Sequence, residues 1–135
     1  MKLVEWNDKF SVQVESIDRQ HMRLINLLNT LFNAMKDNKE YEILEDLIKE
    51  LTDYTKYHFS TEETYFRKFN FKHSDDHIKE HKIFLTKLAE FREAFNSKEQ
   101  NISTEILLFL RDWIDDHILG SDKTYMELFL ENGVK

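Results

Sequence analysis

The chain has 135 residues, with no proline, two glycines, no cysteine and a formal net charge of −7. So few glycines exclude the glycine-rich phosphate loops of Rossmann and P-loop proteins, and the lack of cysteine excludes disulfide scaffolds, zinc fingers and thiol catalysis. The negative charge argues against nucleic acid or an anionic membrane as the main partner, and no apolar run approaches the roughly 18 residues of a membrane span. We expect one domain over residues 1–135, in the cytoplasm because the N-terminus has no apolar stretch of signal-peptide length.

The predicted elements begin with residues 1–17, whose scattered apolar positions lack a helical period and predict an extended arm packed on the domain. Apolar residues then recur at helical spacing in four stretches, which predict helices over about 18–37, 41–66, 74–96 and 103–119. Asp18, Ser74 and Ser103 are the expected N-caps of three of them. A shorter helical pattern follows over about 122–131. Short connectors between amphipathic helices predict an all-α fold, an up-down-up-down antiparallel four-helix bundle.

Five of the six histidines and one glutamate fall at positions that would otherwise hold core residues. These are His21, His58, Glu62, His77, His81 and His117. The pairs that are four residues apart share a helix face, and in an antiparallel bundle all six positions lie at the same end. A lone histidine on an apolar face is more often a hydrogen-bonded core residue, so it is the common layer that favours a metal. A buried layer of polar groups is expensive unless something satisfies it.

Asp122 is a further candidate, five residues after His117, which is a poor spacing for one face of a regular α-helix. A π-bulge, or a break near Gly120, would correct the phase. Two interpretations of Asp122 therefore remain equally open, a metal ligand or the N-cap of the last helical segment. His73 lies outside the layer and is interpreted as a surface or loop histidine.

The donor count indicates two metal ions. Five imidazoles and two carboxylates are too many for one ion, and zinc prefers four ligands that usually include cysteine in structural sites. Two octahedral ions need about 12 ligand positions, of which about 11 are filled if both carboxylates and one oxide or hydroxide bridge the ions. One position would remain for an exogenous ligand.

The order and spacing of these residues resemble the hemerythrin signature, and single-domain bacterial hemerythrins in particular. The resemblance rests on His21, His58-x3-Glu62, His77-x3-His81 and His117-x4-Asp122, on Trp6 in the arm, and on the stretches Ile17–His21, His58–Glu63 and Asp112–Ile118. It covers essentially the whole chain. The usual Tyr-Pro after the second helix is absent, since Lys68-Phe69-Asn70-Phe71 stands there, but this departure falls in a loop.

The resemblance implies a non-heme di-iron centre that binds O2 reversibly, for carriage, storage or delivery, and no enzyme activity. By position, one iron would be saturated by His77, His81 and His117, the other would be held by His21 and His58, and both would be bridged by Glu62 and Asp122. An oxide or hydroxide would bridge them as well, and O2 would bind end-on at the open iron as a hydroperoxide. This implication decides Asp122 in favour of ligation. Trp113, one turn before His117, either walls the pocket with Phe59 and Leu28 or is a plain core aromatic residue.

The alternative functions are a di-iron enzyme acting on peroxide or nitric oxide, an O2 or redox sensor, and an iron buffer. Ferritin-like di-iron enzymes use paired Glu-x-x-His motifs in carboxylate-rich sites, a pattern that this layer lacks. For the O2-binding function, a membrane-bound O2-using enzyme is the candidate recipient. A structural zinc bundle conflicts with the donor count.

Overall fold

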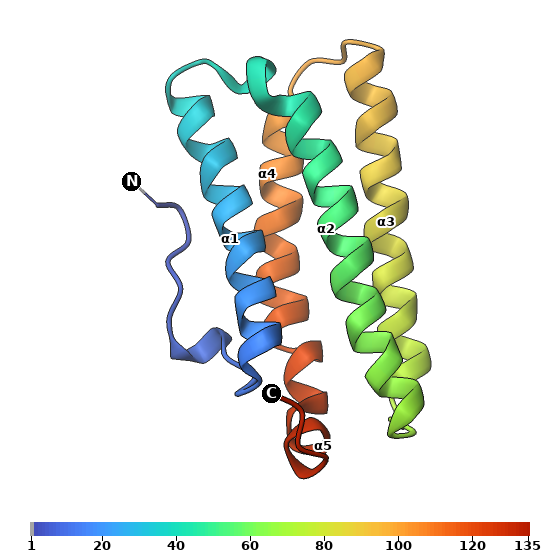
Figure 1. Cartoon of the computed structure of the whole chain (residues 1–135). Coiled ribbons are helices and arrows are strands. Elements are labelled where there is room, and N and C mark those ends of the chain that lie inside the picture. Colours follow the sequence, from blue (N-terminus) through green and yellow to red (C-terminus); the bar gives the residue numbers. More distant parts are fainter. Residues whose placement is uncertain (1) are drawn as a thin grey trace.

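Four long helices dominate the computed structural model, which describes residues 2–135 and has no β-strand among them. They are α1 (Glu15–Lys36), α2 (Glu40–Lys68), α3 (Ser74–Asn96) and α4 (Ile102–Trp113). Successive helices run in opposite directions, and α4 packs against both α1 and α3 (Figure 1). The predicted all-α, antiparallel four-helix bundle is confirmed. None of the helices in the described residues is long and apolar enough to cross a membrane.

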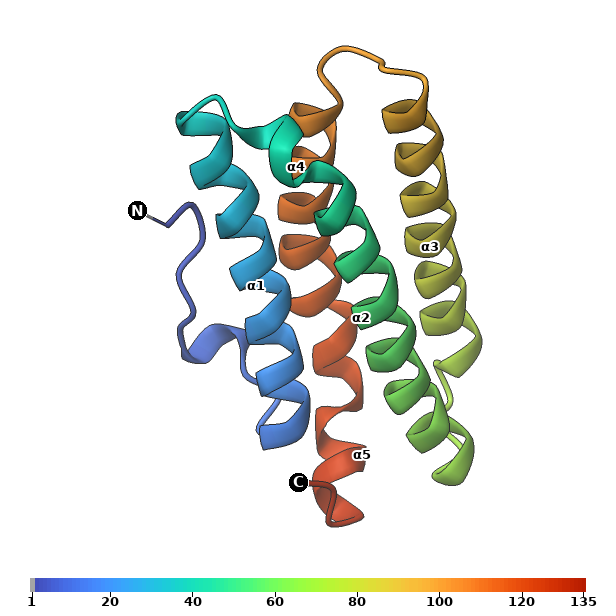
Figure 2. The same cartoon turned by 45° about the horizontal axis from the view of Figure 1, so that its top comes forward.

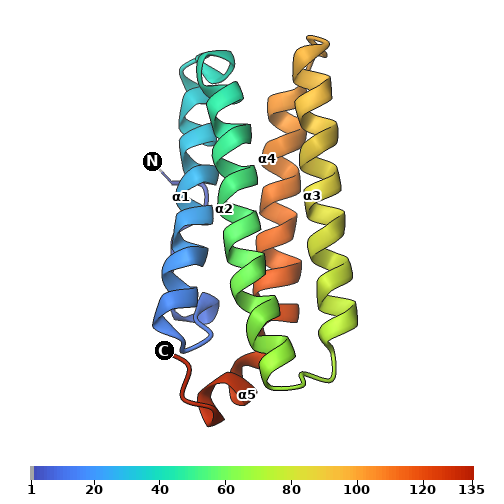
Figure 3. The same cartoon turned by 45° about the vertical axis from the view of Figure 1, so that its right-hand side comes forward.

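Shorter elements complete both ends of the chain. The arm contains the 3-10 turn η1 (Asp8–Phe10), so it is not extended throughout. After α4 come the π-helical turn η2 (Ile114–Ile118), the 3-10 turn η3 (Ser121–Tyr125) and helix α5 (Met126–Glu131). Figures 2 and 3 show α5 at the end of the bundle where α4 finishes. The expected helical segment over 122–131 is therefore a 3-10 turn followed by a short α-helix.

Helix α1 begins three residues before the expected start at Asp18, which is not its N-cap. The Asp18 carboxylate instead accepts hydrogen bonds from the Ser11 hydroxyl at 2.6 Å and from the Val12 backbone N–H at 2.8 Å. Asp18 therefore organises the end of the arm rather than the first turn of the helix. The prediction was wrong because groups of the arm, six and seven residues earlier in the chain, occupy the same carboxylate oxygens.

The two serines predicted as N-caps lie within their helices. Ser74 is the first residue of α3, with His73 at the cap position, and Ser103 is a buried residue of α4. The cap of α4 is Asn101, at a φ of 63°, and neither cap residue makes a side-chain capping bond. Packing of the buried faces therefore decides where these helices begin, rather than capping.

Besides its bonds to Asp18, the arm is tied to the bundle at two further points. Near its start, the Asn29 amide oxygen accepts hydrogen bonds from the backbone N–H groups of Leu3 and Val4, at 2.8 and 3.1 Å. Near its end, the Lys123 ammonium donates to the Ser11 carbonyl at 2.7 Å. The arm therefore bridges helix α1 and the turn η3, which carries Asp122.

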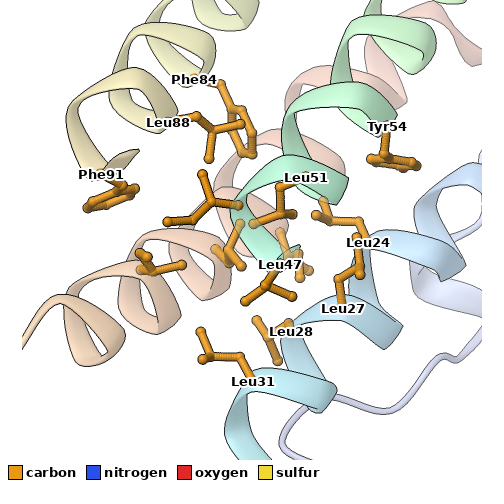
Figure 4. Close-up of a cluster of buried hydrophobic side chains, with 14 of the residues drawn as sticks. Leu24, Leu27, Leu28, Leu31, Leu47, Leu51, Tyr54, Phe84, Leu88 and Phe91 are labelled. Carbon is orange, nitrogen blue, oxygen red and sulfur yellow. The ribbon is translucent and has the colours of Figure 1, made fainter. Parts of the chain in front are cut away.

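The core consists of two apolar clusters. The larger contains leucines and aromatic residues from all four long helices, including Leu24, Leu28, Leu51, Phe84 and Leu88 (Figure 4). The smaller joins the arm to the C-terminal segment and contains Val12, Val14, Ile17, Phe66, Phe71, Tyr125, Phe129 and Val134. On α1, His21 lies in sequence between Ile17 of the smaller cluster and Leu24 of the larger one, and on α2, Glu62 lies between Phe59 of the larger cluster and Phe66 of the smaller one. The polar layer is therefore enclosed by apolar packing on both sides.

Truncation of the larger cluster tests how much the bundle depends on it. Leu51 is fully buried, so Leu51→Ala should lower the free energy of unfolding by about 2–5 kcal/mol, since it leaves a cavity between helices. Urea unfolding followed by circular dichroism measures this change. The control is Leu108→Ala on an exposed position of α4, which should change stability by no more than about 0.5 kcal/mol. Equal losses would contradict the assignment of the core.

Candidate metal centre

All seven candidate ligands meet at one end of the bundle. This is the end formed by the N-termini of α1 and α3 and by the C-terminal parts of α2 and α4, at the bottom of Figure 1. The seven side chains are only 0–4% exposed, and they are His21, His58, Glu62, His77, His81, His117 and Asp122. The predicted layer is therefore present, with each long helix or its extension supplying at least one member.

Asp122 reaches the layer through a change of helix type. Five residues of regular α-helix would turn its side chain about 140° away from that of His117. The chain instead forms the π-helical turn Ile114–Ile118, in which the Leu119 N–H donates to the Ile114 carbonyl at 3.2 Å. The backbone then bends at Gly120, where a Cβ atom would lie 2.6 Å from the Asp116 carbonyl oxygen. Both corrections expected from the sequence, the π-turn and the break, are present.

The seven residues form two overlapping groups. One contains Glu62, His77, His81 and His117, and the other contains His21, His58, Glu62 and Asp122. Within each group the candidate ligand atoms lie within 4.8 Å of one another. The arrangement therefore has room for two ions, with at least one carboxylate common to both.

Both carboxylates contact histidines of both groups. Asp122 Oδ1 lies 2.7 Å from His77 Nε2 and 2.9 Å from His117 Nε2, whereas its Oδ2 lies 3.1 Å from His21 Nε2. Glu62 Oε1 lies 3.1 Å from His81 Nε2 and 3.4 Å from His58 Nε2. Each carboxylate is thus placed where it can bridge two ions.

Three side chains outside the layer hold the outer nitrogens of three of its five histidines. His58 Nδ1 donates to the Gln20 amide oxygen at 2.5 Å, and His81 Nδ1 donates to the Glu63 carboxylate at 2.9 Å. His117 Nδ1 donates to the Glu80 carboxylate at 3.3 Å. A carboxylate only accepts, so these bonds place the imidazole proton on Nδ1 and leave the Nε2 lone pair directed into the layer.

The inner atoms of the layer fit a cation. In residues 2–135, both oxygens of Glu62 and of Asp122 and the Nε2 atoms of His77, His81 and His117 are buried without a hydrogen-bond partner, although they approach one another closely. Lone pairs of nitrogen and oxygen at about 3 Å repel one another unless a proton or a metal lies between them. The imidazole and carboxylate donors suit a transition metal such as iron.

The electrostatics of the layer also favour a bound cation. Burial lowers the pKa of His58 and of His81 to about 4, so these rings stay neutral at neutral pH. Burial also opposes the charged form of His117, but the Asp122 carboxylate raises its pKa to about 10. Burial alone would raise the pKa of Asp122, and the adjacent His117 holds it well below its usual value. The Asp122 carboxylate therefore favours a positive charge beside it, which a bound cation would supply.

Two of the histidines are stacked closely, face to face, on an aromatic ring. The Phe59 ring stacks on His81 with centroids 3.8 Å apart, and the Trp113 ring stacks on His117 at 3.9 Å. Phe59 and Trp113 also contact each other, with centroids 5.8 Å apart. They form an apolar wall on one side of the layer, as the sequence predicted for this pair.

The structure separates His73 from the layer and adds residues that the sequence analysis missed. His73 is exposed at the start of α3, with its ring against Phe71. Gln20, Glu63 and Glu80 were missed because each neighbours a ligand in sequence and so lies about 100° away from it around its helix. Their partners come from other helices, which no spacing within one helix predicts.

Comparison with known proteins identifies the family. The model of the hemerythrin HHE cation binding domain matches residues 12–129. The chain belongs to the hemerythrin family. Among its relatives, the bacteriohemerythrin of Pseudomonas paraeruginosa is 32% identical over 122 residues, which are 90% of this chain and 78% of that protein. The bacteriohemerythrin of Clostridium acetobutylicum is 32% identical over 130 residues, covering 90% of this chain and 98% of that protein.

A solved structure supports the same assignment. The crystal structure of a hemerythrin leucine-to-alanine mutant superimposes with a TM-score of 0.85 at 26% identity, covering 94% of this chain and 97% of that one. The hemerythrin fold and the buried His/Glu/Asp cluster together fit a di-iron site in this chain.

The bend after the π-turn can be tested with Gly120→Ala. The added methyl group would collide with the Asp116 carbonyl, so the turn that carries Asp122 has to shift. We expect a loss of about 1–3 kcal/mol in stability and less than full iron content, measured by urea unfolding and by iron analysis.

Gly133→Ala is the matched control. Gly133 has a φ of 73° and open space around its Cα, so alanine there should cost about 1–2 kcal/mol by backbone strain alone. Its iron content should stay complete. Full iron in both variants would show that Gly120 does not position Asp122.

Proposed function

We propose that this protein binds O2 reversibly at a non-heme di-iron centre, for carriage, storage or delivery. The observation that carries the proposal is the sealed layer of seven buried donors, most of whose inner atoms have no hydrogen-bond partner in residues 2–135. Membership of the hemerythrin family supports it. Five imidazoles against two carboxylates also favour binding over the oxidative chemistry of the carboxylate-rich ferritin-like enzymes.

In this proposal the two ions have unequal sets of ligands. One iron is held by His77, His81 and His117, and the other by His21 and His58, which leaves the second with an open position. Glu62 and Asp122 bridge both ions, together with an oxide or hydroxide. The contacts of each carboxylate with histidines of both groups support the bridging roles.

The protein's own residues supply orientation and exclusion of water. Hydrogen bonds to Gln20, Glu63 and Glu80 hold three imidazoles with Nε2 directed inward. The apolar clusters above and below the layer, and the wall of Phe59 and Trp113, keep solvent from the inner atoms. When bound, the iron pair would supply the electrons that reversible O2 binding requires. A dry site favours release of the gas unchanged, because water and protons promote irreversible oxidation.

Iron analysis with two histidine variants tests the set of ligands. The protein should contain about two iron ions per chain, from the donor count. His77→Ala should lower this content, because it removes a donor of the layer. His73→Ala is the matched control, because His73 lies on the surface about one helical turn before His77. This substitution should leave the iron content unchanged. One iron per chain, zinc in its place, or iron loss in the His73 variant would overturn the assignment.

An optical titration tests the function itself. The reduced protein is kept free of air and titrated with O2, and the gas is then removed. A charge-transfer band that appears and then disappears is expected for reversible binding. Irreversible oxidation, or turnover of added peroxide or nitric oxide at a comparable rate, would favour the enzyme instead.

A further inference from the structure

The two proposed ion sites differ in the groups that hold their histidines from outside. In the site of His77, His81 and His117, the outer nitrogens of two rings donate to carboxylates, His81 to Glu63 at 2.9 Å and His117 to Glu80 at 3.3 Å. Glu80 is held in turn by the Ser121 hydroxyl, which donates to the same oxygen at 2.8 Å. This second bond connects α3 to the turn η3, which carries Asp122.

Among residues 2–135, no carboxylate accepts from the outer nitrogens of His21 and His58. His58 Nδ1 donates to the neutral amide oxygen of Gln20 at 2.5 Å. His21 Nδ1 is buried and has no hydrogen-bond partner in the described part of the chain. One of the two rings is therefore held by an uncharged group and the other by none.

Ring packing follows the same division. His81 and His117 each stack face to face on an aromatic ring, at centroid distances of 3.8 and 3.9 Å. The ring of His58 lies parallel to that of Tyr54 but at 5.7 Å. Within residues 2–135, His21 packs against no ring other than His58, at 4.8 Å and nearly perpendicular. A hydrogen bond at Nδ1 and an aromatic ring stacked on one face therefore both hold His81 and His117. Neither kind of contact holds His21.

These differences act on a bound metal through the imidazoles. A carboxylate that accepts the Nδ1 proton fixes the tautomer and the ring orientation, and it makes Nε2 a stronger donor. An amide oxygen does so more weakly because it carries no net charge. A stronger and better oriented donor binds the ion more tightly and stabilises its oxidised state.

We propose that Glu63 and Glu80 are positioning residues that make the ion of His77, His81 and His117 the tightly held one, whereas the ion of His21 and His58 is released and exchanged first. The inference rests on the proposed di-iron centre and deepens it. The exchangeable ion would be the same one that has the open position. The less constrained imidazoles would let its coordination change when a ligand arrives.

The experiment is a chelator challenge of the reduced, iron-loaded full chain. Ferrozine, which binds ferrous iron, reports release by its colour, and Mössbauer spectra of protein loaded with iron-57 distinguish a six-coordinate ion from one with an open position. The wild-type protein should release iron in two phases, of which the faster comes from the open ion.

Substitutions at the outer partners assign the two phases. Glu63→Gln and Glu80→Gln keep the side-chain shape but remove the charge, and each should accelerate the slow phase by about 10- to 100-fold without changing the fast one. Gln20→Glu places a carboxylate behind His58 and should slow the fast phase. Glu93→Gln, an exposed position on α3, makes the same chemical change away from the layer and should alter neither phase.

The reduction potential separates electronic from merely structural effects. Glu80→Gln should raise the potential of the tightly held iron, and Gln20→Glu should lower that of the open iron, whereas simple loosening of the fold would shift neither selectively. Release in one phase, equal acceleration of both phases, or first loss of the ion of His77, His81 and His117 would overturn the inference.

The outcome is separable from that of the proposed function. Two unequal phases with irreversible oxidation by O2 would leave this inference standing and contradict O2 carriage. Reversible O2 binding with equal release of both ions would support the proposed function and contradict this inference.

Discussion

The structure depends on one constraint, a fully buried polar layer between two apolar clusters. Seven imidazole and carboxylate side chains meet there, and in residues 2–135 most of their inner atoms have no hydrogen-bond partner. Burial of such atoms is costly unless a cation or a proton lies between them. Both apolar clusters, the arm and the C-terminal segment serve to enclose this layer. A bound metal would thus stabilise the fold as well as perform the function.

The supports of the layer are distributed over the whole chain. The arm reaches the turn of Asp122 through Lys123, and the Ser121 hydroxyl joins that turn to Glu80 on α3. The imidazoles of α2, α3 and η2 are each held by a residue of a different helix. Most of these bonds join elements far apart in sequence, so the geometry of the layer exists only once the bundle has formed. The partners also differ in charge, which makes the two halves of the layer chemically unequal.

The sequence predicted the bundle and the layer well because both follow from periodicity. His58 with Glu62 and His77 with His81 share helix faces at a spacing of four, and antiparallel connection brings their ends together. Helix starts were less predictable. Asp18 has the chemistry of an N-cap, yet Ser11 and Val12 compete successfully for its oxygens. The preference of Asp18 for capping was overridden by these contacts, which form where the arm turns into α1.

The sequence by itself determined the fold class and which side chains could form the layer, since helical period and residue chemistry are local properties. The spacing of Asp122 left its place open and only the resemblance to hemerythrins favoured ligation, whereas the tertiary structure brings Asp122 into the layer through the π-turn and the bend at Gly120. The tertiary structure also decided which ring each outer partner holds. Gln20, Glu63 and Glu80 each serve a histidine on another helix, and the packing angle and register between helices set those pairs.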